Sequence, residues 1–479
     1  MDQTEDQQFR RALWPLLFFI FLLVYGLFIH PKLLHQDMLP LEVLTLLALS
    51  VNCVYLLRMG HKWKDIQDSI MKKTSEAIPV IIILFSIGVL IGSWIVCGTI
   101  PMLIYHGISL VEPDWIYVFA FFSCIIFSLL TGTSWGSAGT VGIVMLGIAQ
   151  VYDANLAITA GAIVGGSFFG DKMSPLSDTT NIASLATEVP LFDHIRSMVY
   201  TTGPSAILAA LAYIFLSPGF SSAGKVEYDL VQLNQTLEGL DALFNFNIVL
   251  LLPLLVVIVG SIKSYPTSLT LLFSAWLALI LAVIFQDFAL SDIFQSFNKG
   301  FSVDMGAKLA VNEEVLRILN RGGLYNLIEG VTVVILIFAF IGSLNVLNSI
   351  DLTIDRLMKG IKSRPKAIAA TLTTTLFTNL TTSNQYATSF VIGESFKKIF
   401  DKLKIPRKVL SRSIEDAGTM MENLAPWTPS GIFMATTLGV SALEYAPYQF
   451  LSLINIVIAY FFALTGIACF YKKEEQPST

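Results

Sequence analysis

Two polar stretches interrupt apolar parts of this 479-residue chain, and they hold the residue types best suited to binding ions. The first is GDKMSPLSDTTN at residues 170–181, in which Asp171 and Asp178 lie on either side of Pro175. Proline lacks an N–H and cannot continue a helical hydrogen-bond ladder, so the carbonyl oxygens around it need other partners. Hard cations bind oxygen, and a buried carboxylate without a partner tends to take up a proton. A carboxylate that holds either a cation or a proton can couple the movements of the two.

The second polar stretch, MENLAPWTPSG at residues 421–431, repeats this design. Its acids and prolines, with two acids just upstream, are Glu415, Asp416, Glu422, Pro426 and Pro429. On a helix Glu415 and Glu422 share one face, so both could line one path. Two short polar segments at 131–137 and 380–386 are expected to complete the site.

These segments together give a set of candidate site residues. The candidate ion- and proton-binding residues are Asp171, Asp178, Ser174, Ser177, Thr133, Ser134, Ser383, Asn384, Glu422, Asn423, Thr428, Glu415 and Asp416. The candidate sodium ligands among them are Asp171, Asp178, Ser177 and Thr133, and the candidate helix breaks are Pro175, Pro426 and Pro429. Sodium enters as the substrate, and no cofactor is expected.

The composition indicates the environment that must hold these residues. The chain is 54% hydrophobic and 14% charged, whereas soluble domains carry about 25% charged residues. Many uncharged windows reach the roughly 20 residues that a helix needs to cross a bilayer. Continuous apolar runs favour helices over an alternating barrel pattern, so the sequence predicts an all-α polytopic membrane protein. Without a cofactor loop, metal cluster, catalytic triad or basic-aromatic pattern, it indicates neither an enzyme nor a nucleic-acid-binding protein.

The apolar runs predict about fourteen membrane segments. They are 12–30, 38–57, 77–97, 115–131, 137–151, 155–185, 197–217, 244–262, 267–285, 325–346, 366–382, 384–399, 411–440 and 448–470. Of these, 155–185 and 411–440 are too long and too polar in the middle to be simple spans. The charged segments 58–76 and 288–322 are predicted to be surface helices.

The two halves of the chain resemble each other at offsets of 249 to 251 residues. The matched residues are Gly92 with Gly342, Ser134 with Ser383, and Pro175 with Pro426. Interrupted helices in inverted repeats are a known design of secondary transporters, with the ion site near the midplane. We therefore expect a first repeat at 1–217, an extracytoplasmic linker at 218–243 and a second, inverted repeat at 244–479.

The loop charges favour cytoplasmic termini. Lys and Arg gather around 58–73, 356–366 and 397–408, whereas the segment 218–243 has one lysine and four acids. Basic loops stay on the cytoplasmic side, which places 218–243 outside. The segment 288–322 then lies outside despite its four basic residues.

Structural roles are the alternative for each candidate. A serine or threonine in a membrane helix usually bonds to a backbone carbonyl. Lys172, next to Asp171 in the sequence, would neutralise a carboxylate or face the cytoplasmic water. Which of Asp171 and Asp178 exchanges the ions, and whether Glu422 takes part, stays open at this point.

The run GDKMSPLSDTTNIA at 170–183 closely resembles the signature of the NhaC family of bacterial sodium–proton antiporters. The stretches RSIEDAGTMMENLAPWTPSG at 412–431 and TGTSWG at 131–136 are also similar to segments of that family. The resemblance implies an ion-transporter-like inverted-repeat fold in the bacterial inner membrane, with sodium-coupled antiport. The second break departs from the family's usual SPLIPWNTCG by adding Glu422 and Pro429, which could change the ion stoichiometry or the substrate.

The main hypothesis is therefore exchange of Na⁺, with Li⁺ as a second candidate, for H⁺ by alternating access, serving sodium transport and pH homeostasis. The family also includes members that resemble malate–lactate and amino-acid transporters. Sodium-coupled antiport of such a small organic anion or amino acid is the alternative, and it would need cationic or helix N-terminal donors. A passive channel or sensor is disfavoured by the repeated breaks. The oligomeric state is left open, with a homodimer as one candidate.

Overall fold

The computed structural model describes residues 3–217, 230–305, 311–358 and 360–471, and these ranges contain helices and no strand. Eight helices are long and apolar enough to cross a membrane, or up to ten if each of two bent pairs forms one span. The predicted all-α, polytopic membrane class is confirmed. The larger number of segments expected from the sequence stays a prediction, because several of those segments are broken into short or polar helices.

The α-helices follow one another along two halves of the chain. The first half contains α1 (Gln3–Val24), α2 (His30–Leu34), α3 (Leu41–Arg58), α4 (Trp63–Ser75), α5 (Ile78–Cys97), α6 (Thr99–Leu110), α7 (Ile116–Thr131), α8 (Ser134–Ser137), α9 (Ile143–Val151), α10 (Leu156–Met173), α11 (Asp178–Thr187) and α12 (Leu191–Leu216).

The second half is preceded by helix α13, which lies in the predicted linker 218–243. The helices from there are α13 (Leu230–Leu243), α14 (Leu252–Ile262), α15 (Thr267–Phe285), α16 (Leu290–Lys299), α17 (Glu313–Leu319), α18 (Ile328–Asn345), α19 (Ser349–Met358), α20 (Arg364–Thr382), α21 (Gln385–Lys402), α22 (Arg407–Ala417), α23 (Thr419–Glu422), α24 (Pro429–Leu438), α25 (Ala442–Tyr445) and α26 (Phe450–Thr465). Short 3₁₀ or π-helical turns lie at Tyr25–Ile29, Pro113–Trp115, Ala138–Gly142, Ile248–Leu251, Val303–Met305, Tyr325–Leu327 and Ala446–Tyr448. The rest of the predicted linker, 218–229, lies outside the described residues.

Helix α5 shows how local sequence sets the ends of an element. Pro79 lies in its first turn, where a missing N–H removes no helical hydrogen bond. Gly98 ends the helix with a φ of +90°, a left-handed conformation that glycine adopts without strain. A short apolar helix, α6, begins directly after Gly98, and the sequence analysis did not predict it.

Both long polar segments are broken, as their prolines predict. In the first, α10 ends at Met173 and α11 begins at Asp178, with Pro175 between them. In the second, α22 ends at Ala417, the single turn α23 follows, and α24 begins at Pro429. Each break therefore brings polar backbone and side chains into the interior of an otherwise apolar helical protein.

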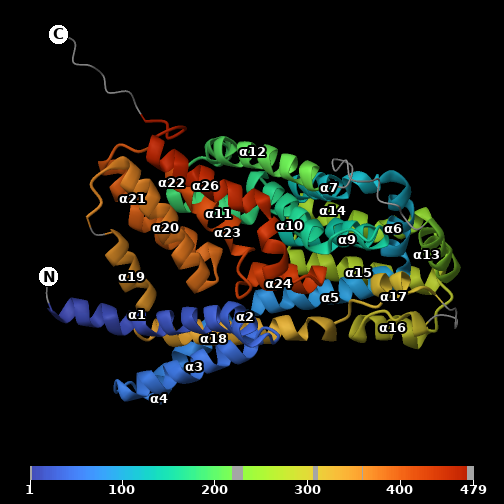
Figure 1. Cartoon of the computed structure of the whole chain (residues 1–479), viewed down its shortest axis with the longest axis horizontal. Helices are drawn as coiled ribbons and strands as arrows, with labels where there is room; N and C mark the ends of the chain where they lie inside the picture. Colours follow the sequence, from blue (N-terminus) through green and yellow to red (C-terminus); the bar gives the residue numbers. More distant parts are fainter. Residues whose placement is uncertain (1–2, 218–229, 306–310, 359, 472–479) are drawn as a thin grey trace, which may run out of the picture.

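The amphipathic helices predicted for the two charged segments, α4 and α16, each pack against a spanning helix of the other half. Helix α4 contacts α18, and α16 contacts α5. Ser69 of α4 donates a 2.7 Å hydrogen bond to the carbonyl of Gly342 in α18. A Cβ on Gly92 of α5 would collide with the backbone carbonyl of Ser296 in α16. Figure 1 shows α4 near one end of the molecule and α16 near the other, so the two contacts are made far apart.

Candidate functional site

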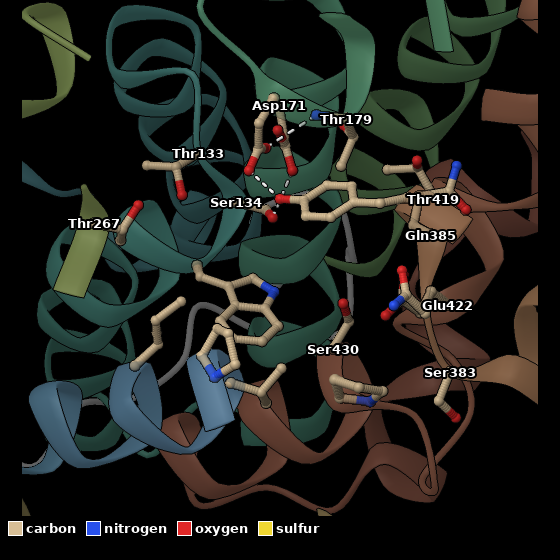
Figure 2. Close-up of a pocket in the computed structure, with 18 of the residues that line it drawn as sticks. Thr133, Ser134, Asp171, Thr179, Thr267, Ser383, Gln385, Thr419, Glu422 and Ser430 are labelled. Atoms are coloured by element: carbon tan, nitrogen blue, oxygen red, sulfur yellow. Dashed lines mark hydrogen bonds between the residues drawn. The ribbon is translucent and has the colours of Figure 1, made fainter. Parts of the chain in front are cut away.

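A cavity of about 260 Å³ lies where the two breaks meet, and both halves of the chain line it. Figure 2 shows polar side chains from both halves around this space. The predicted site residues that line it are Thr133, Ser134, Asp171, Asp178, Ser383, Asn384 and Glu422. The structure thus brings together residues that the sequence holds far apart.

Four polar residues cap the helices that begin around this cavity. The Oγ1 of Thr133 accepts from the N–H of Gly136, and the Oδ1 of Asn384 accepts from Ala387, at 3.3 and 2.9 Å. The caps of α11 and α24 are Ser177 and Thr428, whose hydroxyl oxygens accept from the backbone N–H three residues on at 3.4 and 3.1 Å. A helix N-terminus carries a partial positive charge, so this arrangement stabilises nearby carboxylates.

Asp171, at the end of α10, is the best-anchored carboxylate of the cavity. It is 5% exposed, and each of its oxygens accepts a hydrogen bond from a serine. Ser134 donates to Oδ2 at 2.7 Å and Ser177 to Oδ1 at 2.6 Å. Because a hydroxyl has one hydrogen and two lone pairs, each serine can donate to this carboxylate or turn its oxygen toward a cation.

Asp178 differs from Asp171 in exposure and in partner. It lies exposed in the first turn of α11, where the helix dipole favours its charge. Its Oδ2 accepts a hydrogen bond from the phenol of Tyr386, at the start of α21 in the other half. Asp178 therefore lies on the accessible side of the cavity and Asp171 on the buried side.

The acids of the second break are distributed over different depths. Glu422 is 7% exposed and lines the cavity, whereas Glu415 is fully buried and lies four residues before Thr419, on the other side of the interruption at Gly418. Asp416 is buried and pairs with Lys172. Lys172, expected to neutralise a carboxylate or face water, is fully buried and neutralises an acid of the other half rather than its sequence neighbour.

Three candidate residues make hydrogen bonds typical of structural roles. Ser174 donates to the carbonyl of Leu129 at 3.0 Å. The side chain of Asn423 is fully buried and accepts from Gln449 at 3.0 Å. Thr428 caps α24 and donates to the carbonyl of Ala425 at 2.9 Å. These contacts stabilise the broken segments and leave Asp171, Asp178 and Glu422 as the carboxylates of the breaks that line the cavity.

The cavity is also lined by polar residues that were not among the candidates, namely Glu76, Thr179, Thr267, Gln385, Tyr386, Thr419 and Ser430. Tyr386 is the last residue of the polar segment 380–386, so its position gave a signal that was not used. Glu76 also lines the cavity and pairs with Lys73 at 2.7 Å. It ends a segment predicted to lie on the surface, and it lies two residues before α5, whose Pro79 and Val80 line the same cavity.

Comparisons with known proteins identify the family of this chain. Residues 166–467 match the model of the Na⁺/H⁺ antiporter family. The chain is 39% identical over 431 residues to an uncharacterized Na⁺/H⁺ antiporter of Haemophilus influenzae, covering 90% of this chain and 91% of that protein. It is 35% identical over 430 residues to the Na⁺/H⁺ antiporter NhaC of Alkalihalophilus pseudofirmus, covering 90% of both chains. It is 33% identical over 435 residues to a malate-2H⁺/Na⁺-lactate antiporter of Bacillus subtilis, covering 91% of both. The chain therefore belongs to the Na⁺/H⁺ antiporter family and, within it, to the NhaC antiporters.

Proposed function

We propose that this protein exchanges Na⁺, and also Li⁺, for H⁺ across a bacterial inner membrane by alternating access. The observation that carries the proposal is the buried Asp171 carboxylate in a cavity that both broken segments line. The relatives named as Na⁺/H⁺ antiporters, which match this chain over most of its length, support the same pair of ions.

Competition at Asp171 accounts for the coupling. One carboxylate buried in a small cavity holds a proton or a dehydrated cation, because either neutralises it. Ser134 and Ser177 satisfy the carboxylate when the cation has left, and their lone pairs join the cation's ligands when it is bound. Each ion therefore displaces the other, and a switch of access between the two sides converts this competition into exchange.

The order of elements supports an inverted repeat of 1–217 and 244–479 around this site. In each half a long apolar helix (α5 or α18) precedes a helix that ends at a polar turn (α7 or α20) and then a broken segment. Matched positions in the two halves, Ser177 and Thr428, cap the helices after the breaks. We place both termini on the cytoplasmic side, as the basic loops favour.

Exchange of a small organic anion is the second candidate, because capped helix N-termini at the cavity suit a substrate carboxylate. A related protein is named as a malate-2H⁺/Na⁺-lactate antiporter. Against this candidate, the described residues that line the cavity include no Lys or Arg, and the nearby Lys172 is already paired with Asp416. A cavity lined by carboxylates and lacking such a cation favours Na⁺ over an anion.

Everted vesicles that hold the protein and a pH-sensitive dye test the proposal. Adding Na⁺ or Li⁺ should move protons with the wild-type protein and should have no effect with Asp171→Asn. The matched control is Glu394→Gln, which makes the same kind of change at a carboxylate that is 70% exposed on α21 and should leave exchange intact. If the Asp171→Asn protein exchanges ions at the wild-type rate, this carboxylate has no part in the mechanism. Sodium-driven uptake of labelled malate without cation–proton exchange would establish the second candidate instead.

A further inference from the structure

Helix α20 contains two groups of threonines that behave differently. Thr371, Thr373 and Thr381 donate to carbonyls one turn back, at 2.9, 2.9 and 2.7 Å. The hydroxyls of three other threonines on this helix are buried and have no hydrogen-bond partner among the described residues: Thr374, Thr375 and Thr378. Since a helical threonine can satisfy itself on its own backbone, the second group indicates a polar interior beside α20.

The neighbouring helix α22 contributes a carboxylate to the same interior. Helices α20 and α22 pack against each other. Glu415 of α22 is 0% exposed, and neither of its oxygens has a hydrogen-bond partner within the described residues. Three buried cations on α22 and adjacent elements are already engaged. Lys172 pairs with Asp416, Lys397 pairs with Glu188 and Glu394, and Arg412 donates to the carbonyl of Ala468 at 2.8 Å. A buried carboxylate in this state is costly, so it calls for a bound partner.

Two neutral oxygens lie where α22 ends. The hydroxyl of Thr419 and the Oε1 of Gln385 are buried and unpartnered within the described part of the chain, and both residues line the cavity. The Gln385 amide packs directly on Gly418, since a Cβ there would lie 2.7 Å from its Nε2. Thr419 follows Gly418 and lies four residues after Glu415 in sequence. Figure 2 shows Thr419 and Gln385 on the cavity wall opposite Thr133.

We propose that Glu415, Thr419 and Gln385 bind a second Na⁺, separate from the position at Asp171. One carboxylate and two neutral oxygens are the donors that a hard, monovalent cation takes. The cation would enter from the cavity between Thr419 and Gln385 and neutralise Glu415, while Lys172 stays paired with Asp416. The two breaks would then each supply one carboxylate site, so that one chain binds two Na⁺. This inference rests on the proposed function, since it gives the cation of that function a further site.

Equilibrium binding of radioactive Na⁺ to the purified full-length protein tests the second site directly. We expect two Na⁺ per chain for the wild type, one for Glu415→Gln, one for Asp171→Asn and two for the exposed control Glu394→Gln. A wild type that binds one Na⁺, or a Glu415→Gln protein that keeps the wild-type number, overturns the proposal. In the latter case Glu415 is a protonated acid that serves only the structure.

A conservative pair of variants decides the matter if Glu415→Gln does not fold. Thr419→Ala removes one ligand and should raise the half-saturating Na⁺ concentration of one site about tenfold, whereas Thr419→Ser keeps the hydroxyl and should match the wild type. Equal Na⁺ binding by the two Thr419 variants would contradict the proposal. The everted-vesicle assay separates this inference from the proposed function. If the wild type exchanges Na⁺ for H⁺ but binds only one Na⁺ per chain, the second site alone is refuted. If the wild type shows no exchange, the proposed function is refuted.

Discussion

Replacing Lys172 with methionine should destabilise the protein, because it removes the nearer countercharge of the buried Asp416 carboxylate and leaves only Arg412, whose Nε lies 3.9 Å from Oδ2. The side chains of Lys172 and Asp416 are 0% and 1% exposed, and removing one partner of such a pair costs about 3–5 kcal/mol. Asp416 keeps hydrogen bonds from Thr201 at 2.9 Å and Asn455 at 3.0 Å. We therefore expect the lower end, about 3 kcal/mol, which is a factor of roughly 150 in the folding equilibrium.

A double-mutant cycle with Asp416→Asn separates the ion pair from its surroundings. The measurement is the free energy of unfolding in mixed micelles, followed by tryptophan fluorescence. Lys172→Met with Asp416→Asn should recover most of the loss, because the carboxylate that Lys172 neutralised is removed together with it. The control is Arg196→Met, which removes a surface pair at 4.0 Å whose side chains are 81% and 54% exposed and should cost less than about 1 kcal/mol. The pairing argument is wrong if Lys172→Met loses no more unfolding free energy than Arg196→Met does. It is also wrong if the loss in the double mutant equals the sum of the losses in the two single mutants.

Two further perturbations test the packing and the surface charge. Gly342→Ala should lower the free energy of unfolding by about 1–3 kcal/mol, because a Cβ there would lie 2.7 Å from the backbone of α4. Gly203→Ala, whose Cβ would meet its nearest atom at 3.8 Å, should be neutral by the same measurement, and equal effects of the two would contradict the close packing. The hydrogen bonds and charges of Lys397 and Arg407 hold the pKa of Glu188 below its ordinary value. The ionised form is thus favoured in the folded state, so its contribution is complete above the ordinary pKa of about 4.3 and is lost as the pH falls through the lower folded value. Thermal unfolding midpoints should show wild type above Glu188→Gln at neutral pH and the two converging in acid, and a difference that is the same at both pH values would refute this.

The sequence predicted the helical membrane class and both breaks because proline and apolar run length act locally. Pro175 interrupts a helix wherever it lies, so the end of α10 near Met173 required no knowledge of the rest of the fold. The cavity-lining positions of Asp171 and Glu422 followed from the same argument, since each acid precedes such a proline.

What the sequence could not provide was the choice of partner between distant elements. Lys172 was adjacent to Asp171, and only the packing of α10 near α22 and α26 makes Asp416 its counterion. Glu76 has the sequence surroundings of a solvated charged helix, yet it lies at the cavity beside the first turn of α5. Charge and composition give each residue a list of suitable partners, whereas tertiary packing selects one of them.

The reciprocal contacts of α4 and α16 constrain the order in which the protein can be completed. Gly92 of α5 is synthesised roughly 200 residues before Ser296, which at about 5–20 residues per second leaves a gap of about 10–40 seconds. During that interval the part of α5 around Gly92 lacks its packing partner α16, and α4 likewise lacks its partner α18. Neither half can therefore reach its final packing during translation until the other has emerged. Two separately produced halves should complement each other for the same reason, since each supplies the helix that the other lacks.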